Sequence, residues 1–326
     1  MTAPADNGSA APILQVRDLR VYYHTPLGPV KAVDGVSFSL KAGERFGVVG
    51  ESGSGKSTIA LSLLRMHKPP ARIEGGQILL DGTDLVTLSG AEVRLLRLAT
   101  VALIAQGAMN SLNPVIRVRD QMMDGLKDHG ERLSRSELNV RVCELLERVG
   151  LNPEVAQLFP HELSGGMKQR VVIAISISLR PKVIVADEPT SALDVVVQMQ
   201  VMETLRKVQQ ELGSAVILVG HDMGLMAQFV DRLAVMYAGK LVEVSPVHDI
   251  FAAPLHPYTA LLIASLPTLR AKSQLQGIPG LPPSLLNRGG GCSFFARCPK
   301  AMDVCRTEEP ALRAIQPGHW VACHLF

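Results

Sequence analysis

The chain has 326 residues, 47% of them hydrophobic, which is enough apolar material for one large domain or for a core domain with a smaller appendage. Its formal net charge is only +3 at pH 7, so no broad electrostatic attraction favours nucleic acid or an anionic membrane surface. No apolar run approaches the ~18 to 20 residues needed to cross a bilayer, so this chain is not expected to form a membrane channel itself.

The N-terminal segment Met1–Ala11 is small, polar and slightly acidic. It lacks the cationic and apolar parts of a secretory signal, which favours a protein that remains inside the cell. We expect residues 1–12 to form a flexible tail that precedes the main domain, residues 13–250.

Between Ile13 and about Glu243, short β-branched runs alternate with helical patterns. This alternation predicts an α/β fold with a mostly parallel sheet flanked by helices. The strand candidates are Arg45–Val49, Thr100–Ala105, Val183–Ala186, Ala215–Val219 and Leu233–Tyr237. After Gln106 the strand pattern gives way to helical spacing, which predicts a helical subdomain inserted at about residues 107–165.

A glycine-rich segment, Gly50-Glu51-Ser52-Gly53-Ser54-Gly55-Lys56-Ser57-Thr58, follows an apolar run and precedes a helical pattern. This is the strand–loop–helix setting of a phosphate-binding P-loop. The glycines let backbone N–H groups surround phosphates at a helix N-terminus, where the helix dipole favours anions. We predict that Lys56 contacts the β- and γ-phosphates of ATP and that the Ser57 hydroxyl binds Mg²⁺. A chance glycine-rich turn is the alternative, which the intact Gly-Lys-Ser in this setting disfavours.

Further along, an apolar strand ends in two carboxylates, at Val183-Ile184-Val185-Ala186-Asp187-Glu188. Successive side chains of a strand point to opposite faces, but at the strand's end both can reach one site. We predict that Asp187 holds Mg²⁺, directly or through water, and that Glu188 is the general base for the attacking water. An Asp-Glu pair by itself is more often a solvated strand end or a helix cap, and the P-loop upstream reverses that preference.

The segment Leu163-Ser164-Gly165-Gly166-Met167-Lys168-Gln169-Arg170 resembles the signature of the ABC ATPases, both in sequence and in its position shortly before the carboxylate pair. Ser164 and the backbone of Gly165 and Gly166, at a helix N-terminus, form a second phosphate-binding surface. In the ABC family that surface closes over ATP held by the P-loop of another subunit. Because this chain contains one ATPase domain, the resemblance implies a second ATPase subunit as its partner.

Other residues resemble functional residues of the family and follow the same order along the chain. Tyr23 resembles the aromatic residue that stacks on adenine, and Gln106 resembles the Q-loop residue. Ser191-Ala192-Leu193-Asp194 resembles the D-loop, and His221 resembles the switch histidine. The resemblance implies that Gln106 senses Mg²⁺ or the attacking water and that His221 hydrogen-bonds the γ-phosphate. Taken singly, each residue has a simpler structural interpretation. Their shared order favours the functional one, and with Glu188 also present we expect an active site.

The resemblance extends from Leu14 to Leu325 and is closest to the ATPase subunits of oligopeptide and dipeptide importers. Besides the cysteine-containing tail, it is carried by Ala32-Val33-Asp34-Gly35-Val36-Ser37-Phe38, Ser111-Leu112-Asn113-Pro114-Val115, Pro160-His161-Glu162-Leu163-Ser164 and His256-Pro257-Tyr258-Thr259. It implies an ABC nucleotide-binding domain over residues 13–250, at the cytoplasmic face of the cell membrane. The implied partners are a related but distinct ATPase chain, two transmembrane permease subunits and an extracytoplasmic substrate-binding protein, with no nucleic acid.

Alternatives remain within and beyond this family. Relatives of this subtype also import nickel or oligosaccharides, and nothing in an ATPase motif recognises a peptide. An ABC ATPase acting on DNA or ribosomes is a second hypothesis, but the long coiled coils, zinc modules or tandem ATPase domains of such proteins are not seen. A regulatory module without catalysis is disfavoured by Glu188. The Q-loop segment Ala105-Gln106-Gly107-Ala108-Met109 departs from the family's usual phenylalanine-glutamine-aspartate-proline form at the contact with the transmembrane partner.

After Ser245 the composition shifts to proline and then glycine, which predicts a linker and a small accessory domain over residues 251–326. Apart from Cys143, the cysteines gather there, at Cys292, Cys298, Cys305 and Cys323. Four thiolates suit a [4Fe–4S] cluster and also tetrahedral zinc. A reducing compartment disfavours disulfides, while free structural cysteines remain an alternative.

The spacing of these cysteines lacks the close Cys-x-x-Cys pairs typical of zinc sites. The stretches Gly291-Cys292-Ser293-Phe294, Arg297-Cys298-Pro299 and Val321-Ala322-Cys323-His324 resemble the tail of peptide-importer ATPases associated with iron–sulfur binding. The resemblance therefore favours the cluster, in a structural role, over zinc.

Overall fold

The computed structural model describes residues 11–266, 277–286 and 288–326. They divide into two compact units. The first unit contains the chain up to Lys41, Arg45–Thr87 and Leu218–Phe326, and the second contains Ala42–Glu44 and Leu88–Ile217. The predicted P-loop therefore belongs to the first unit and the predicted carboxylate pair to the second. Of the predicted N-terminal tail, all but residues 11 and 12 lies outside the described residues.

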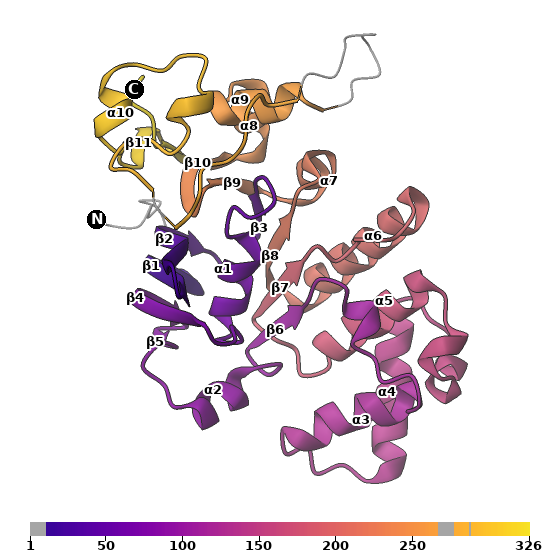
Figure 1. The fold of residues 1–326 in the computed structure, drawn as a ribbon. Coiled ribbons are helices and arrows are strands. Elements are labelled where there is room, and N and C mark those ends of the chain that lie inside the picture. The colour runs from indigo at the N-terminus through magenta and orange to yellow at the C-terminus, as the bar shows by residue number, and fades with distance from the viewer. Residues whose placement is uncertain (1–10, 267–276, 287) are drawn as a thin grey trace. The chain divides into compact units, whose positions relative to one another are not determined.

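An antiparallel sheet begins the first unit (Figure 1). In sheet order its strands are β2 (Gly28–Leu40), β1 (Leu14–Thr25), β4 (Ala71–Leu80) and β5 (Thr83–Asp84). A tight hairpin joins β1 to β2, with Thr25 paired to Gly28, and the φ of +123° at Gly28 is one that glycine adopts readily. The prediction of a mostly parallel sheet is wrong for these strands, because so short a connection forces its two strands to run antiparallel.

The remaining strands of the first unit combine both directions. In sheet order they are β11 (Arg313–Gln316), β12 (His319–Val321), β10 (Lys240–Pro246), β9 (Arg232–Tyr237) and β3 (Arg45–Val49). β3 and β9 pair in parallel, whereas the other pairs are antiparallel. The strands predicted at Arg45–Val49 and Leu233–Tyr237 are confirmed. Those at β10, β11 and β12 were not predicted.

The helices of the first unit are mostly short. They are α1 (Lys56–Leu63), α7 (Met223–Phe229), α8 (Val247–Ala252), α9 (Pro257–Ala264), the 3₁₀ turn η4 (Phe295–Arg297) and α10 (Val304–Thr307). α9 begins with Pro257 at its first position, where the missing N–H is not needed. The side chain of His256 caps this helix by accepting from the N–H of Tyr258 at 3.0 Å.

A fully buried carboxylate holds the C-terminal residues to β10. Glu243 accepts hydrogen bonds from the N–H groups of Leu255 and His256, at 2.8 and 2.9 Å, and pairs with His319 Nε2 at 2.7 Å. β12 adds a backbone pairing, with Val321 opposite Glu243. A buried carboxylate is stable only when such donors surround it, so Leu255, His256 and His319 contribute to the core of the first unit.

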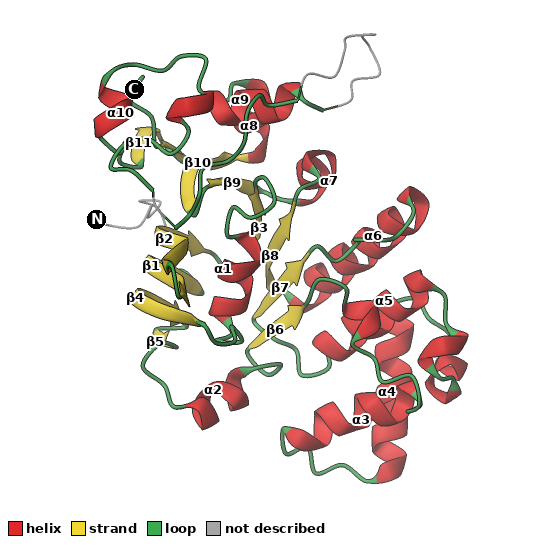
Figure 2. Cartoon of the chain, in the orientation of Figure 1, coloured by secondary structure: helices red, strands yellow, loops and turns green. Residues whose placement is uncertain are grey.

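The second unit is mainly helical (Figure 2). Its helices are α2 (Gly90–Leu96), η1 (Ala108–Asn110), α3 (Val118–Asp128), α4 (Arg135–Arg148), η2 (Pro153–Gln157), η3 (Pro160–Glu162), α5 (Gly165–Ser176) and α6 (Val195–Leu212). Two strands, β6 (Val101–Ile104) and β7 (Val183–Asp187), pair in parallel, and β8 (Ala215–Gly220) runs from this unit into the first. All three were predicted to within a residue or two.

Local sequence accounts for the helices between β6 and β7. α4, for example, begins with a capping box, in which Ser134 Oγ accepts from the N–H of Glu137 and the Glu137 carboxylate accepts from the N–H of Ser134. Its buried residues recur at helical spacing, at Leu138, Val142, Leu145 and Leu146. Across the described ranges, no helix has both the length and the apolar character of a membrane span.

Candidate nucleotide site

The P-loop of the first unit lies between β3, which ends at Val49, and α1, which begins at Lys56. Gly50 and Gly55 have φ values of +154° and +104°. A Cβ atom would lie 2.2 Å from the carbonyl oxygen of Met236 at the first position and 2.0 Å from that of Ala32 at the second. Only glycine therefore fits at either position, and the loop packs closely against the backbone behind it.

Lys56 and Ser54 are buried polar side chains of this segment. Lys56 Nζ donates to the carbonyl oxygens of Gly50 and Glu51, both at 2.9 Å, and its side chain is buried. The Ser54 hydroxyl is buried with no hydrogen-bond partner among the described residues. A buried ammonium and an unsatisfied hydroxyl beside a helix N-terminus provide positive charge and hydrogen-bonding capacity, which suits a phosphate group.

Two other predicted residues lie on elements of the first unit. Tyr23, on β1, places its hydroxyl 3.3 Å from that of Thr58, in the first turn of α1. The structure thus brings the predicted adenine-stacking residue to the helix that follows the P-loop. His221 is exposed and lies directly after β8, before the N-cap of α7, where the Asp222 side chain accepts from the N–H of Leu225 at 3.0 Å.

In the second unit, Gln106 and Glu188 lie together. Gln106 Nε2 donates to Glu188 Oε2 at 3.0 Å, although the two are 82 residues apart in sequence. Asp187 is the buried last residue of β7. Glu188 follows with a φ of +46°, an uncommon conformation for a residue other than glycine. Because strain of this kind gathers at functional sites, it supports a catalytic role for Glu188.

The signature segment forms the start of α5, also in the second unit. Ser164 is the N-cap, and its hydroxyl accepts from the N–H of Met167 at 3.3 Å. A Cβ atom on Gly166 would lie 2.5 Å from Val197 Cγ1 of α6. Gly166 is therefore needed for close helix packing, independently of any ligand. The predicted D-loop ends at Asp194, the N-cap of α6, whose side chain accepts from the N–H of Val197.

The four C-terminal cysteines are free thiols, and Cys292 N–H donates to the carbonyl oxygen of Cys305 at 2.8 Å. Burial raises the pKa of Cys292 to about 11, and the nearby thiols of Cys305, Cys323 and Cys298 add to this effect. Burial also raises the pKa of Cys298 and of Cys323, again with contributions from neighbouring thiols. The four thiols therefore lie within electrostatic range of one another. Even so, the described residues contain no group of three or more His, Cys, Asp or Glu side chains arranged to hold a metal ion.

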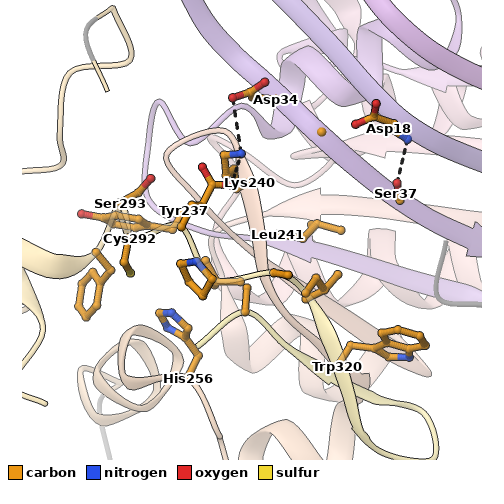
Figure 3. Close-up of a pocket in the computed structure, with 18 of the residues that line it drawn as sticks. Asp18, Asp34, Ser37, Tyr237, Lys240, Leu241, His256, Cys292, Ser293 and Trp320 are labelled. Atoms are coloured by element: carbon orange, nitrogen blue, oxygen red, sulfur yellow. Dashed lines mark hydrogen bonds and ion pairs between the residues drawn. The ribbon is translucent and has the colours of Figure 1, made fainter. Parts of the chain in front are cut away.

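A cavity of about 260 Å³ opens in the first unit between the N-terminal sheet, β10 and the cysteine-containing tail (Figure 3). Charged groups on its wall pair with one another: Lys240 with Asp34 at 3.5 Å, and Arg20 with Asp18 at 2.9 Å. His256 also faces the cavity, and burial lowers its pKa to about 4, so this histidine is neutral near pH 7. None of the predicted nucleotide residues lines this space.

The P-loop, with its buried lysine and glycine-lined turn, defines a nucleoside triphosphatase of the P-loop class. Residues 33–191 match the family described as ABC transporter, and residues 242–305 match the C-terminal region of oligopeptide/dipeptide transporters. The chain belongs to the ABC transporter family and is an ATPase of that family. The resemblance seen in the sequence is confirmed.

Individual relatives agree with this assignment. The chain is 43% identical over 317 residues to the dipeptide transport ATP-binding protein DppD of Escherichia coli (strain K12), covering 96% of each protein. It is 42% identical over 322 residues to the probable peptide ABC transporter ATP-binding protein y4tR of Sinorhizobium fredii, covering 97% of this chain and 96% of that one. A solved dimer of the ATP-binding cassette MJ0796, bound to ADP and phosphate, is similar with a TM-score of 0.64 and 26% identity, covering 72% of this chain and 98% of that one.

Two contacts of the P-loop were missed by the sequence analysis. Tyr258 Oη accepts a hydrogen bond from the N–H of Glu51 at 2.9 Å, and Arg297 forms an ion pair with the Glu51 carboxylate at 2.7 Å. Tyr258 lies in a segment that resembles the importer ATPases, but the resemblance assigns no function to this residue. Arg297 lies in the stretch Arg297-Cys298-Pro299, which resembles the family's tail, but that stretch does not identify its partner, which is 246 residues away.

Proposed function

We propose that this chain is the ATP-hydrolysing subunit of an importer for dipeptides or oligopeptides. The observation that carries the proposal is the pair of family matches, because the second one, over residues 242–305, lies outside the ATPase motifs and is described as the C-terminal region of oligopeptide/dipeptide transporters. Relatives named as dipeptide or peptide transport proteins match along nearly the whole chain, which supports the same substrate class.

In this proposal, each predicted residue has one task. The P-loop N–H groups and Lys56 hold the phosphates, and Tyr23 stacks on the adenine ring. Ser57 and Asp187 offer the oxygen ligands that Mg²⁺ prefers. Glu188 accepts the proton of the attacking water, Gln106 holds the Glu188 carboxylate in place, and His221 hydrogen-bonds the γ-phosphate. Magnesium, when bound, neutralises charge that develops on the phosphates.

We further propose that residues 13–250 form the nucleotide-binding domain, with a helical subdomain at about 107–165, and that residues 251–326 act as an accessory domain. Ser164, Gly165 and Gly166 would close over ATP held by a second, related ATPase chain. The dimer of the similar cassette MJ0796 supports such a pairing. Two permease subunits and a substrate-binding protein complete the assembly, with this chain at the cytoplasmic face of the membrane.

The substrate assignment predicts peptide-stimulated ATP hydrolysis. In proteoliposomes that contain the complete transporter, binding protein loaded with a dipeptide or a pentapeptide is expected to raise the ATPase rate and to drive labelled peptide inward. Stimulation by nickel or by an oligosaccharide, with none by peptide, would reject the peptide assignment and retain the importer. Stimulation by DNA or ribosomes, with no permease copurifying, would reject transport altogether.

For the accessory domain, we propose that Cys292, Cys298, Cys305 and Cys323 hold a [4Fe–4S] cluster with a structural role. The hydrogen bond from the N–H of Cys292 to the carbonyl oxygen of Cys305, at 2.8 Å, brings two of these cysteines together and supports a shared ligand. Tetrahedral zinc is the alternative, since four thiolates suit it as well. The sequence lacks the close Cys-x-x-Cys pairs typical of zinc sites, which favours the cluster over zinc.

Anaerobically purified protein is accordingly expected to be brown, and to contain about four iron atoms and four acid-labile sulfides per chain. Cys298→Ser should lose both while the P-loop still binds ATP. Cys143→Ser, at the one cysteine outside the tail, is the matched control and should retain both. Stoichiometric zinc without sulfide would replace the cluster by a zinc site, and metal-free protein would end the proposal.

A further inference from the structure

We propose that Arg297, in the cysteine-containing tail, is a positioning residue for nucleotide binding. It neutralises the carboxylate of Glu51, which lies within the P-loop, and so removes a negative charge that would repel the phosphates. The inference rests on the proposed function, since it takes the P-loop to be an ATP site.

Arg297 and Glu51 form a bidentate ion pair. Arg297 Nη1 donates to Glu51 Oε2 at 2.7 Å, and Arg297 Nη2 donates to Glu51 Oε1 at 2.9 Å. Paired hydrogen bonds of this type are the strong form of an arginine–carboxylate interaction, because charge and geometry act together. The Glu51 carboxylate correspondingly holds the pKa of Arg297 above its usual value. The arginine side chain is 5% exposed and that of Glu51 is 24% exposed, so solvent reaches the pair only from the side of the carboxylate.

The remaining donors of Arg297 fix its position. They bind the carbonyl oxygens of Pro279 and Ile278, at 2.8 and 3.2 Å, and the hydroxyl of Tyr237 at 3.1 Å. All three acceptors are uncharged, so the Glu51 carboxylate is the partner that balances the guanidinium charge. A buried arginine with this set of partners forms a preformed receptor for one carboxylate.

Glu51 is the second residue of the P-loop segment, next to the expected phosphate site. Its carbonyl oxygen accepts from Lys56 Nζ, and its N–H donates to Tyr258 Oη. Its backbone is therefore part of the phosphate-binding loop, and its side chain adds a negative charge to a site built for an anion. Like charges within one binding site disfavour binding, unless one of them is neutralised by a close cation. Arg297 is that cation.

Arg297 also links the P-loop to the cysteines. It is the last residue of η4 and directly precedes Cys298. Phe294, at the N-cap of the same turn, packs on Tyr237 and Tyr258 with ring centroids 5.1 and 5.4 Å apart. One turn of chain thus carries a cysteine, the aromatic contact and the arginine that binds Glu51. A change that separates Arg297 from Glu51, rather than loss of a metal group alone, is therefore expected to weaken nucleotide binding.

A double-mutant cycle on the full chain tests this inference, with calorimetric titration of Mg-ADP as the readout because ADP is not hydrolysed. Arg297→Ala is expected to weaken ADP binding by about tenfold or more, since it leaves the Glu51 carboxylate uncompensated. Adding Glu51→Gln to Arg297→Ala should bring the affinity back to within about threefold of wild type. Arg297→Lys should fall between, because it keeps the charge but loses the two-pronged geometry.

Arg313→Ala, at an exposed arginine of β11 in the same tail, is the matched control and should bind ADP as wild type does. Unchanged binding in Arg297→Ala would overturn the proposal. So would a double variant as weak as Arg297→Ala, because the arginine would then act through the fold and not through its charge. If thermal unfolding shows that Arg297→Ala does not fold, the ADP affinities of Arg297→Lys and of Arg297→Lys with Glu51→Gln are compared instead. A wild-type chain that binds no ADP would instead reject the proposed function.

Discussion

Replacing Glu188 with glutamine is expected to lower the ATP turnover of the assembled transporter by about 10²- to 10⁴-fold, the usual contribution of a general base. The amide keeps the size of the side chain and can still bond to Gln106, but it cannot accept the proton of the attacking water. ATP binding should survive, because the phosphates are held by the P-loop. Steady-state phosphate release and equilibrium binding of ATP, measured on the same preparation, give the two quantities.

The same variant also tests the second ATPase subunit. If two cassettes close over ATP, blocked hydrolysis should trap the closed pair, which size-exclusion chromatography with and without ATP would detect. Glu203→Gln is the matched control, because Glu203 is an exposed carboxylate on α6 whose side chain is 74% exposed. Wild-type turnover in Glu188→Gln would assign the base to another residue.

Local features of the fold were predictable from the sequence. The P-loop needs glycines at fixed positions because of backbone contacts at Gly50 and Gly55, and that requirement is visible in the sequence. The strands β3 and β7 are short apolar runs with clear ends, so their bounds were predicted closely. By contrast, the broad alternation of strands and helices predicts parallel strands and does not indicate the antiparallel hairpin of β1 and β2, which depends on the tight turn at Gly28.

Non-local contacts were not predictable from residues alone. The bond between Gln106 and Glu188 joins two loops that follow separate strands, and only the family resemblance related them. Glu51 and Arg297 each lie in a segment that the sequence marks, the P-loop and the cysteine-containing tail, but nothing in the sequence indicates that the two side chains pair. For the cysteines, the sequence shows the number of thiols but not the distances between them. These contacts depend on how segments far apart in sequence pack together, and sequence periodicity reports only local structure.

Lys56→Ala should act on binding, in contrast to Glu188→Gln. The change removes an ammonium group that lies buried in the P-loop, so we expect Mg-ATP to bind about 10- to 100-fold more weakly, as for the loss of one or two hydrogen bonds to a charged partner. The change also removes the hydrogen bonds from Lys56 to the carbonyl oxygens of Gly50 and Glu51. The nucleotide-free loop is then less well ordered. Lys68→Ala, at an exposed lysine just after α1, is the control for a general loss of positive charge. Titration of the full chain with Mg-ATP in the Glu188→Gln background separates affinity from turnover. Wild-type affinity in Lys56→Ala would show that the phosphates are held without this ammonium, and the assignment of the loop as the ATP site would then have to be withdrawn.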